Sequence, residues 1–203
     1  MKIEKYIKTG KSKYQLYLDN GEVLDTYDDV ILKEDLLLKK EFDSYTYQRI
    51  ITQTKLQEYY NACLKYISIR IRSTKEIIDY LKRKKVAEED IDYIVQKLTK
   101  EKLLDDNYFC QCFIKDKLRF TTMGDYKIIY ELKKHNITQN IIENNRYLID
   151  EEVLTEKIDK IIRKKIETNK KLDKSTLRNK LYNNLLNSGY SSSLVTKRLN
   201  YYF

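Results

Sequence analysis

Residues 77–91 read IIDYLKRKKVAEEDI, and the same apolar pattern returns as IIYELKKHNITQNII at 128–142 and as LYNNLLNSGYSSSLV at 181–195. The first spacing, of four residues, puts two side chains on one face of a helix. The next spacing, of five, leaves room for a connector before another helix begins. The sequence therefore predicts a repeated helix–connector–helix unit. The apolar or aromatic positions of the three copies are Ile77, Leu81, Val86, Ile91, Ile128, Leu132, Ile137, Ile142, Leu181, Leu185, Tyr190 and Val195.

Helix starts repeat as well. Leu-Leu-Asp-Asp at 103–106 and Leu-Ile-Asp-Glu at 148–151 each precede an apolar helical segment. We expect three repeats of three helices, at 54–104, 105–149 and 150–203, the third lengthened by polar residues near 167–174. Because each repeat of such a chain contacts mainly its neighbours, the fold class is predicted to be mainly α, with the repeats forming an elongated curved array.

Residues 1–53 have a different pattern. Partial alternation of apolar and polar residues predicts short strands near 2–8, 12–18 and 22–27, and Asn20-Gly21 is typical of a hairpin turn. Residues 28–37 then read as a helix. We expect a small β-rich segment and a linker helix to precede the repeats.

Composition limits the class of protein. The chain has 203 residues, 41% of them hydrophobic, with no proline and 4 glycines, which permits a largely helical fold. The N-terminus lacks the apolar stretch of a secretory signal, and no apolar run is long enough to span a membrane. Three cysteines argue against a disulfide framework. We expect a cytoplasmic protein that does not act at membranes.

Positive charge is concentrated at the C-terminal end. The formal net charge is +9, and residues 154–203 hold 12 Lys and Arg against 4 Asp and Glu. A basic segment attracts polyanions such as nucleic acid or an acidic protein surface. The alternative is a solvated pair of lysine-rich helices with no ligand.

Candidate polyanion contacts lie in two clusters and at one isolated position. Arg70 and Arg72 point to different helix faces, so that one could form an intramolecular ion pair while the other meets a partner. Arg119 is a weaker analogue in the second repeat. The full set is Arg70, Arg72, Lys82, Arg83, Lys84, Lys85, Arg119, Lys164, Lys165, Lys170, Lys171, Lys174, Arg178, Lys197 and Arg198.

Two adjacent carboxylates, Asp105 and Asp106, could form a metal or catalytic pair, but N-caps that oppose the helix dipole are the favoured interpretation. Ser73 with Glu76 fits a capping box. The aromatic residues have helical spacing and are expected to pack in the core or between repeats. His135, the one histidine, is expected to be exposed in a connector.

No enzyme signature is present in the sequence. It has no phosphate-binding glycine loop, no nucleophile elbow and no zinc-ligand spacing, so we expect neither a catalytic site nor a metal or cofactor.

Three segments together resemble the RecX family of bacterial recombination regulators. Residues 70–84 resemble its R-x-R-S-x-x-E-L…L-x-x-K run, residues 103–109 resemble its L-L-D-D-x-x-F segment, and Gly124 through Ile137 resemble its G-x-x-x-I-x-x-E-L run. Lys85 and Asn136 stand where the family usually has glycine, in the connectors.

This resemblance implies a regulator that binds RecA and the RecA–single-stranded DNA filament and suppresses ATP hydrolysis, strand exchange and recombination. The basic residues above are then the candidates for contact with that filament, and the sequence does not show which face would meet it. The alternative is a stand-alone nucleic-acid-binding protein of helix-turn-helix-like modules. A monomer that also contacts DNA directly is compatible with both.

Overall fold

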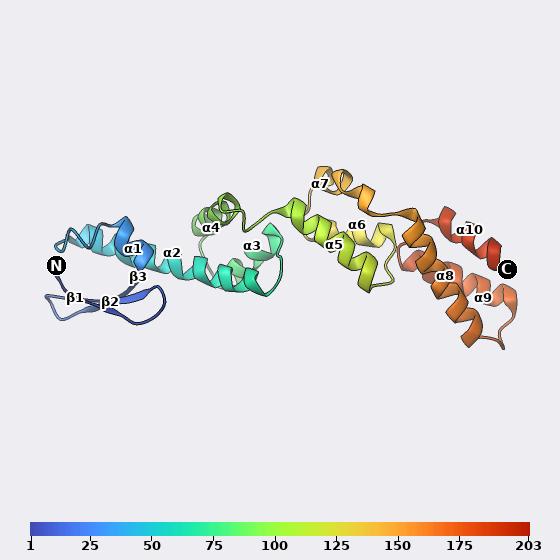
Figure 1. The fold of residues 1–203 in the computed structure, drawn as a ribbon, viewed down its shortest axis with the longest axis horizontal. Coiled ribbons are helices and arrows are strands. Elements are labelled where there is room, and N and C mark those ends of the chain that lie inside the picture. The colour runs from blue at the N-terminus through green and yellow to red at the C-terminus, as the bar shows by residue number, and fades with distance from the viewer. The chain divides into compact units, whose positions relative to one another are not determined.

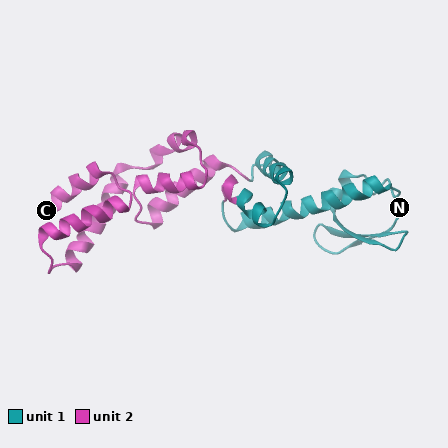
Figure 2. Ribbon diagram, turned by 180° about the vertical axis from the view of Figure 1, so that it is seen from behind, with its two compact units in different colours: residues 1–71, 77–103 teal, residues 72–76, 104–203 magenta.

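The computed structural model describes residues 1–203 and contains two compact units. The N-terminal unit comprises residues 1–71 and 77–103, and the C-terminal unit comprises residues 72–76 and 104–203 (Figure 2). The chain is mainly helical and carries one sheet near its N-terminus (Figure 1), which confirms the predicted fold class. None of the helices has the length and apolar character that crossing a membrane requires.

The sheet has three antiparallel strands in the order β1-β2-β3. They are β1 (Ile3–Lys8), β2 (Lys13–Leu18) and β3 (Val23–Tyr27), close to the predicted ranges. Gly21 adopts φ +83° in the turn between β2 and β3, and the Asn20 side chain accepts a hydrogen bond from the Glu22 amide at 3.1 Å. The Asn-Gly pair therefore sets this hairpin, because glycine reaches positive φ without strain.

Two helices cover one face of the sheet. The short helix α1 (Asp28–Lys33) follows β3 directly, and α2 (Ser44–Ile69) begins at the N-cap Asp43, which accepts from the Thr46 amide at 2.8 Å. Because α2 runs without a break past residue 53, the predicted boundary between the β-rich segment and the first repeat falls inside a helix. The core beneath these helices consists of Ile3, Leu16, Leu18, Tyr27, Val30, Ile31, Leu36 and Ile50.

The remaining helices follow the predicted threefold order. After α2 come α3 (Thr74–Arg83) and α4 (Glu88–Lys100). The second group is α5 (Asp106–Phe120), α6 (Asp125–Lys134) and α7 (Gln139–Asn144), followed by the 3-10 turn η1 (Arg146–Leu148). The third is α8 (Glu151–Thr168), α9 (Lys174–Asn187) and α10 (Ser192–Tyr202).

All twelve repeat positions identified in the sequence are buried, each at 8% exposure or less. Equivalent connectors also share a backbone conformation: φ is +59° at Lys85, +59° at Asn136 and +88° at Gly189. The left-handed turn that ends each middle helix is therefore kept even where glycine is absent. Lysine is strained in this region, whereas asparagine tolerates it better.

In the C-terminal unit, backbone contacts fasten α6 to the α9–α10 connector. The Gly124 amide donates to Ser188 O at 2.8 Å and the Tyr126 amide donates to Gly189 O at 3.0 Å. These bonds satisfy free amides at the start of α6. A Cβ on Gly124 would lie 2.3 Å from Gly189 O, so glycine is required for this approach. Tyr190 adds a hydrogen bond from its hydroxyl to Thr122 O at 3.0 Å.

Candidate functional site

A groove of about 770 Å³ lies in the C-terminal unit between the C-terminal end of α5 and the side of α8. We call it the α5–α8 groove. One wall is formed by residues 118–122 and the other by α8 residues between Val153 and Lys164. Five of its side chains are cationic, namely Arg119, Lys157, Lys160, Arg163 and Lys164, and two are anionic, Glu156 and Asp159.

The cations on α8 form a stripe. Lys157, Lys160 and Lys164 are separated by three and four residues, so they share one helix face and extend over about 10 Å at 1.5 Å per residue. Lys160 and Lys164 are exposed. Like charges at such spacing repel one another, and a bound anion would relieve that repulsion.

Lys157 is the most enclosed cation of the groove. Its ammonium donates to Lys117 O at 3.4 Å, a long hydrogen bond to a carbonyl at the end of α5. Burial lowers the pKa of Lys157 from its ordinary value, because removal from water penalises the charged form. A carboxylate or phosphate in the groove would give this ammonium a stronger acceptor.

Asp159 contributes little free negative charge to the groove. Arg198, on α10, forms a bidentate pair with it, with Nε–Oδ1 and Nη2–Oδ2 distances of 2.7 Å. This pair holds α10 against α8. The Asp159 hydrogen bonds raise the pKa of Arg198, so the guanidinium stays charged. Arg198, predicted as a polyanion contact, is thus engaged in packing within the third repeat.

The groove also has an apolar side. Leu118, Phe120, Val153 and Ile161 line it, and Phe120 is 70% exposed at the end of α5. The Arg119 guanidinium lies 5.0 Å from the centre of the Phe120 ring. A ligand that is both anionic and partly apolar would match the two walls.

Of the predicted basic residues, the structure brings Arg119 and Lys164 together in the groove. Sequence reasoning missed Lys157, Lys160 and Arg163 as site residues. Their spacing along α8 is visible in the sequence, but only folding shows that this face opposes the end of α5. Lys165, Lys170, Lys171 and Lys174 are exposed around the α8–α9 connector and do not line the groove. Arg178 donates to Asn200 Oδ1 at 2.7 Å.

The basic residues near α3 have other surroundings. Arg72 is buried, at 8% exposure, and its Nη1 lies 3.6 Å from Glu76 Oε1. This burial corrects its prediction as a surface contact and favours the intramolecular alternative. Lys82 pairs with Glu88 at 2.9 Å. Arg83, Lys84 and Lys85 are exposed at the end of α3, and Arg70 is exposed at the C-cap of α2.

The two adjacent carboxylates cap two different helices. Asp105 is the N-cap of α5 and accepts from the Asn107 and Tyr108 amides at 2.8 and 3.0 Å. Asp106 accepts from the Thr74 amide at 2.8 Å, so it caps α3 from outside. The predicted capping box is present, since Ser73 Oγ accepts from the Glu76 amide at 3.3 Å and Glu76 Oε2 accepts from the Ser73 amide at 3.1 Å.

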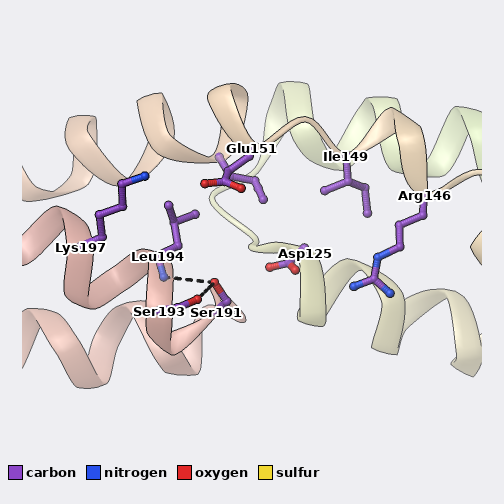
Figure 3. Close-up of a pocket in the computed structure, with 9 residues that line it drawn as sticks. Asp125, Arg146, Ile149, Glu151, Ser191, Ser193, Leu194 and Lys197 are labelled. Atoms are coloured by element: carbon purple, nitrogen blue, oxygen red, sulfur yellow. Dashed lines mark hydrogen bonds between the residues drawn. The ribbon is translucent and has the colours of Figure 1, made fainter.

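A smaller pocket of about 330 Å³ lies where α6, η1–α8 and α10 meet (Figure 3). It contains the predicted residue Lys197 together with Arg146, and also two carboxylates, Asp125 and Glu151. One carboxylate oxygen of Asp125 is buried without a hydrogen bond. Its positive and negative groups balance, so this pocket lacks the excess of positive charge found in the α5–α8 groove.

Single residues that could have carried chemistry are engaged in packing. His135 lies half-buried against the rings of Phe109 and Phe113, at 5.1 and 5.4 Å between centroids, so the expectation of an exposed histidine was wrong. Burial raises the pKa of the Cys63 and Cys110 thiols to about 11.

The aromatic residues divide into two groups. Tyr60, Phe109 and Tyr190 are buried, as their helical spacing predicts. Tyr108, Tyr126, Tyr130 and Tyr201 are more than half exposed, which contradicts the expectation that they pack in the core or between repeats.

Fold and surface define a helical-repeat protein with clusters of cationic side chains on its surface. Comparison with known proteins gives the same class. The model of the RecX first three-helix domain matches residues 60–98. Regulatory protein RecX of Streptococcus gordonii is 30% identical over 193 residues, which cover 95% of this chain and 74% of the relative. The RecX protein of Halalkalibacterium halodurans is 27% identical over 192 residues, covering 93% and 72%.

Two solved RecX structures share the fold of this chain. A crystal structure of regulatory protein RecX superimposes with a TM-score of 0.84 at 24% identity, covering 95% of this chain and 96% of that one, which shows a shared fold. RecX from Lactobacillus salivarius has a TM-score of 0.66 at 25% identity, over 71% of this chain and 94% of that one. The chain belongs to the RecX family of regulatory proteins.

Proposed function

We propose that this protein binds RecA and RecA–single-stranded DNA filaments and restrains RecA's ATP hydrolysis and strand exchange, acting as a monomer in the bacterial cytoplasm. Membership of the RecX family supports this role, since its relatives are named regulatory proteins. The observation that supports a particular binding surface is the α5–α8 groove, which is lined by five cationic side chains. A RecA–DNA filament offers both phosphates and protein carboxylates to such a surface.

The test is RecA's DNA-dependent ATPase, measured with the full-length chain at a ratio well below one per RecA monomer. We expect inhibition by the wild-type protein and weaker inhibition by Lys160→Glu/Lys164→Glu, which reverses two exposed groove charges. The matched control is Lys39→Glu/Lys40→Glu, which makes the same change in net charge at exposed residues of the N-terminal unit, outside the groove and outside the predicted set. No inhibition by the wild-type protein at any ratio would refute the proposal.

A second candidate is stand-alone nucleic-acid binding, which the convergence of cations beside the exposed Phe120 ring also favours. It predicts tight binding to naked DNA without RecA and a steep fall in affinity with salt. The RecA-directed function instead predicts that filament binding exceeds naked-DNA binding at moderate salt. Co-sedimentation with DNA alone and with preformed RecA–DNA filaments separates the two.

A further inference from the structure

The two walls of the α5–α8 groove differ in character. The α8 wall presents Lys157, Lys160 and Lys164 as a stripe of positive charge, whereas the α5 wall presents Leu118 and Phe120. A ligand that is only anionic would leave the side chains of the apolar wall exposed to water. A ligand with carboxylates on one side and an apolar side chain on the other would satisfy both walls.

The α5 wall also favours protein over nucleic acid. It is the C-terminal end of a 15-residue helix, where backbone carbonyls carry partial negative charge. Glu156 adds a carboxylate to the groove. A nucleic acid strand carries a phosphate at every nucleotide, so some phosphates would lie near these groups. A protein segment can place its carboxylates only along the α8 stripe.

The apolar lining is mainly aliphatic. Leu118, Val153 and Ile161 accompany the single ring of Phe120, and that ring already carries the Arg119 guanidinium at 5.0 Å. Planar bases bind most favourably to aromatic platforms, whereas branched or aromatic side chains fit irregular aliphatic surfaces. Lys157 in the same groove lacks a strong acceptor, because its hydrogen bond to Lys117 O is 3.4 Å long.

We propose that the α5–α8 groove binds an acidic protein segment, with its carboxylates on the α8 lysines and an apolar side chain against Leu118 and Phe120. This inference rests on the proposed function, because it names the kind of partner that the groove would take in the regulated complex. It adds that recognition needs an apolar anchor as well as negative charge.

The probe is a fluorescein-labelled peptide of glutamate and aspartate with a leucine or phenylalanine at every fourth position. Its matched control has serine at those positions and the same net charge. Fluorescence anisotropy with the full chain should show tighter binding of the apolar peptide. Two variants, Lys160→Glu/Lys164→Glu and Phe120→Ser, should each weaken that binding about tenfold or more. The control Lys39→Glu/Lys40→Glu, in the N-terminal unit, should bind within about twofold of wild type.

Three outcomes would overturn the inference: no binding of the apolar peptide at low salt, equal binding of both peptides, or displacement of the bound peptide by stoichiometric oligo(dT). The third outcome would assign the groove to nucleic acid. Circular dichroism should show that each variant is folded, because the substituted side chains are exposed.

The ATPase assay with the same variants separates this inference from the proposed function. Suppose that Lys160→Glu/Lys164→Glu loses RecA inhibition but the wild-type protein does not bind the peptide. The proposed function would then stand, and binding of an acidic segment would be refuted. Peptide binding by a chain that never inhibits RecA would refute the function and leave the groove assignment.

Discussion

Replacing Gly124 with alanine should destabilise the C-terminal unit, although alanine suits the local backbone. Gly124 has φ −81° and ψ 173°, a conformation open to any residue. At such a position glycine to alanine normally stabilises by about 0.4–1 kcal/mol, because it restricts the unfolded chain. The added Cβ would lie 2.3 Å from Gly189 O and 2.4 Å from the Tyr190 amide nitrogen. These are backbone atoms, so the junction itself must open.

The cost follows from the hydrogen bonds at that junction. Opening it breaks the bonds from Gly124 N to Ser188 O and from Tyr126 N to Gly189 O. It also pulls the Tyr190 hydroxyl away from Thr122 O. At about 1 kcal/mol for each bond, with a further penalty for any amide left buried, the loss is about 2–4 kcal/mol. In urea this corresponds to a midpoint shift of about 1–2 M.

Urea denaturation followed by circular dichroism measures the loss of stability. Hydrogen exchange at the Tyr126 amide shows whether that loss arises at this junction. The matched control is Gly10→Ala, whose Cβ would meet Lys13 Cβ at an ordinary 3.5 Å. That variant should change stability by less than about 1 kcal/mol. If Gly124→Ala unfolds at the same urea concentration as Gly10→Ala and keeps Tyr126 protected, the argument from close approach is wrong.

Three further predictions concern caps and buried groups. Asp106→Ala should cost about 0.5–2 kcal/mol and speed amide exchange at Thr74, because Asp106 caps α3; unchanged exchange there would contradict this role. Burial, with a smaller contribution from the charge of a nearby aspartate, raises the pKa of Tyr190 to about 12. The unfolded chain ionises near 10, so stability should fall as pH rises from 10 to 12, and Tyr190→Phe should reduce that dependence in pH-dependent denaturation, although the pKa of Tyr60 is raised as well. Cys63 and Cys110 should resist iodoacetamide at pH 8 in the folded chain and react once it is unfolded, as measured by mass spectrometry, because both thiols are buried with pKa values of about 11.

The three equivalent connectors share one backbone conformation, and they show where tertiary packing overrides the local preference of a residue. Lys85 and Asn136 adopt the same left-handed backbone as Gly189, although residue preference alone would favour only the glycine. Burial of the next residue in each copy, Val86 or Ile137, compensates for the strain. Periodicity was thus a better guide to the connectors than the identity of the connector residue.

The sequence predicted the fold better than it predicted the candidate site. Charge counting located the basic end of the chain, but it could not distinguish the groove lysines from those of the α8–α9 connector. It also placed Arg72 and Arg198 among the surface contacts. The structure shows Arg72 buried beside Glu76, and Arg198 paired with Asp159. Helical spacing alone does not show which neighbouring element a face will meet.

By itself the sequence determined the mainly helical class, the strands of the N-terminal sheet and the twelve core positions, because apolar periodicity and turn chemistry are local properties of the chain. Tertiary structure decided which cations share a groove, which arginines turn inward, and that Asp105 and Asp106 cap different helices. The groove, the Arg198–Asp159 pair and the Asp106 cap on α3 each depend on residues about 30 to 40 positions apart meeting through core packing, and a pattern within one helix carries no information about that meeting.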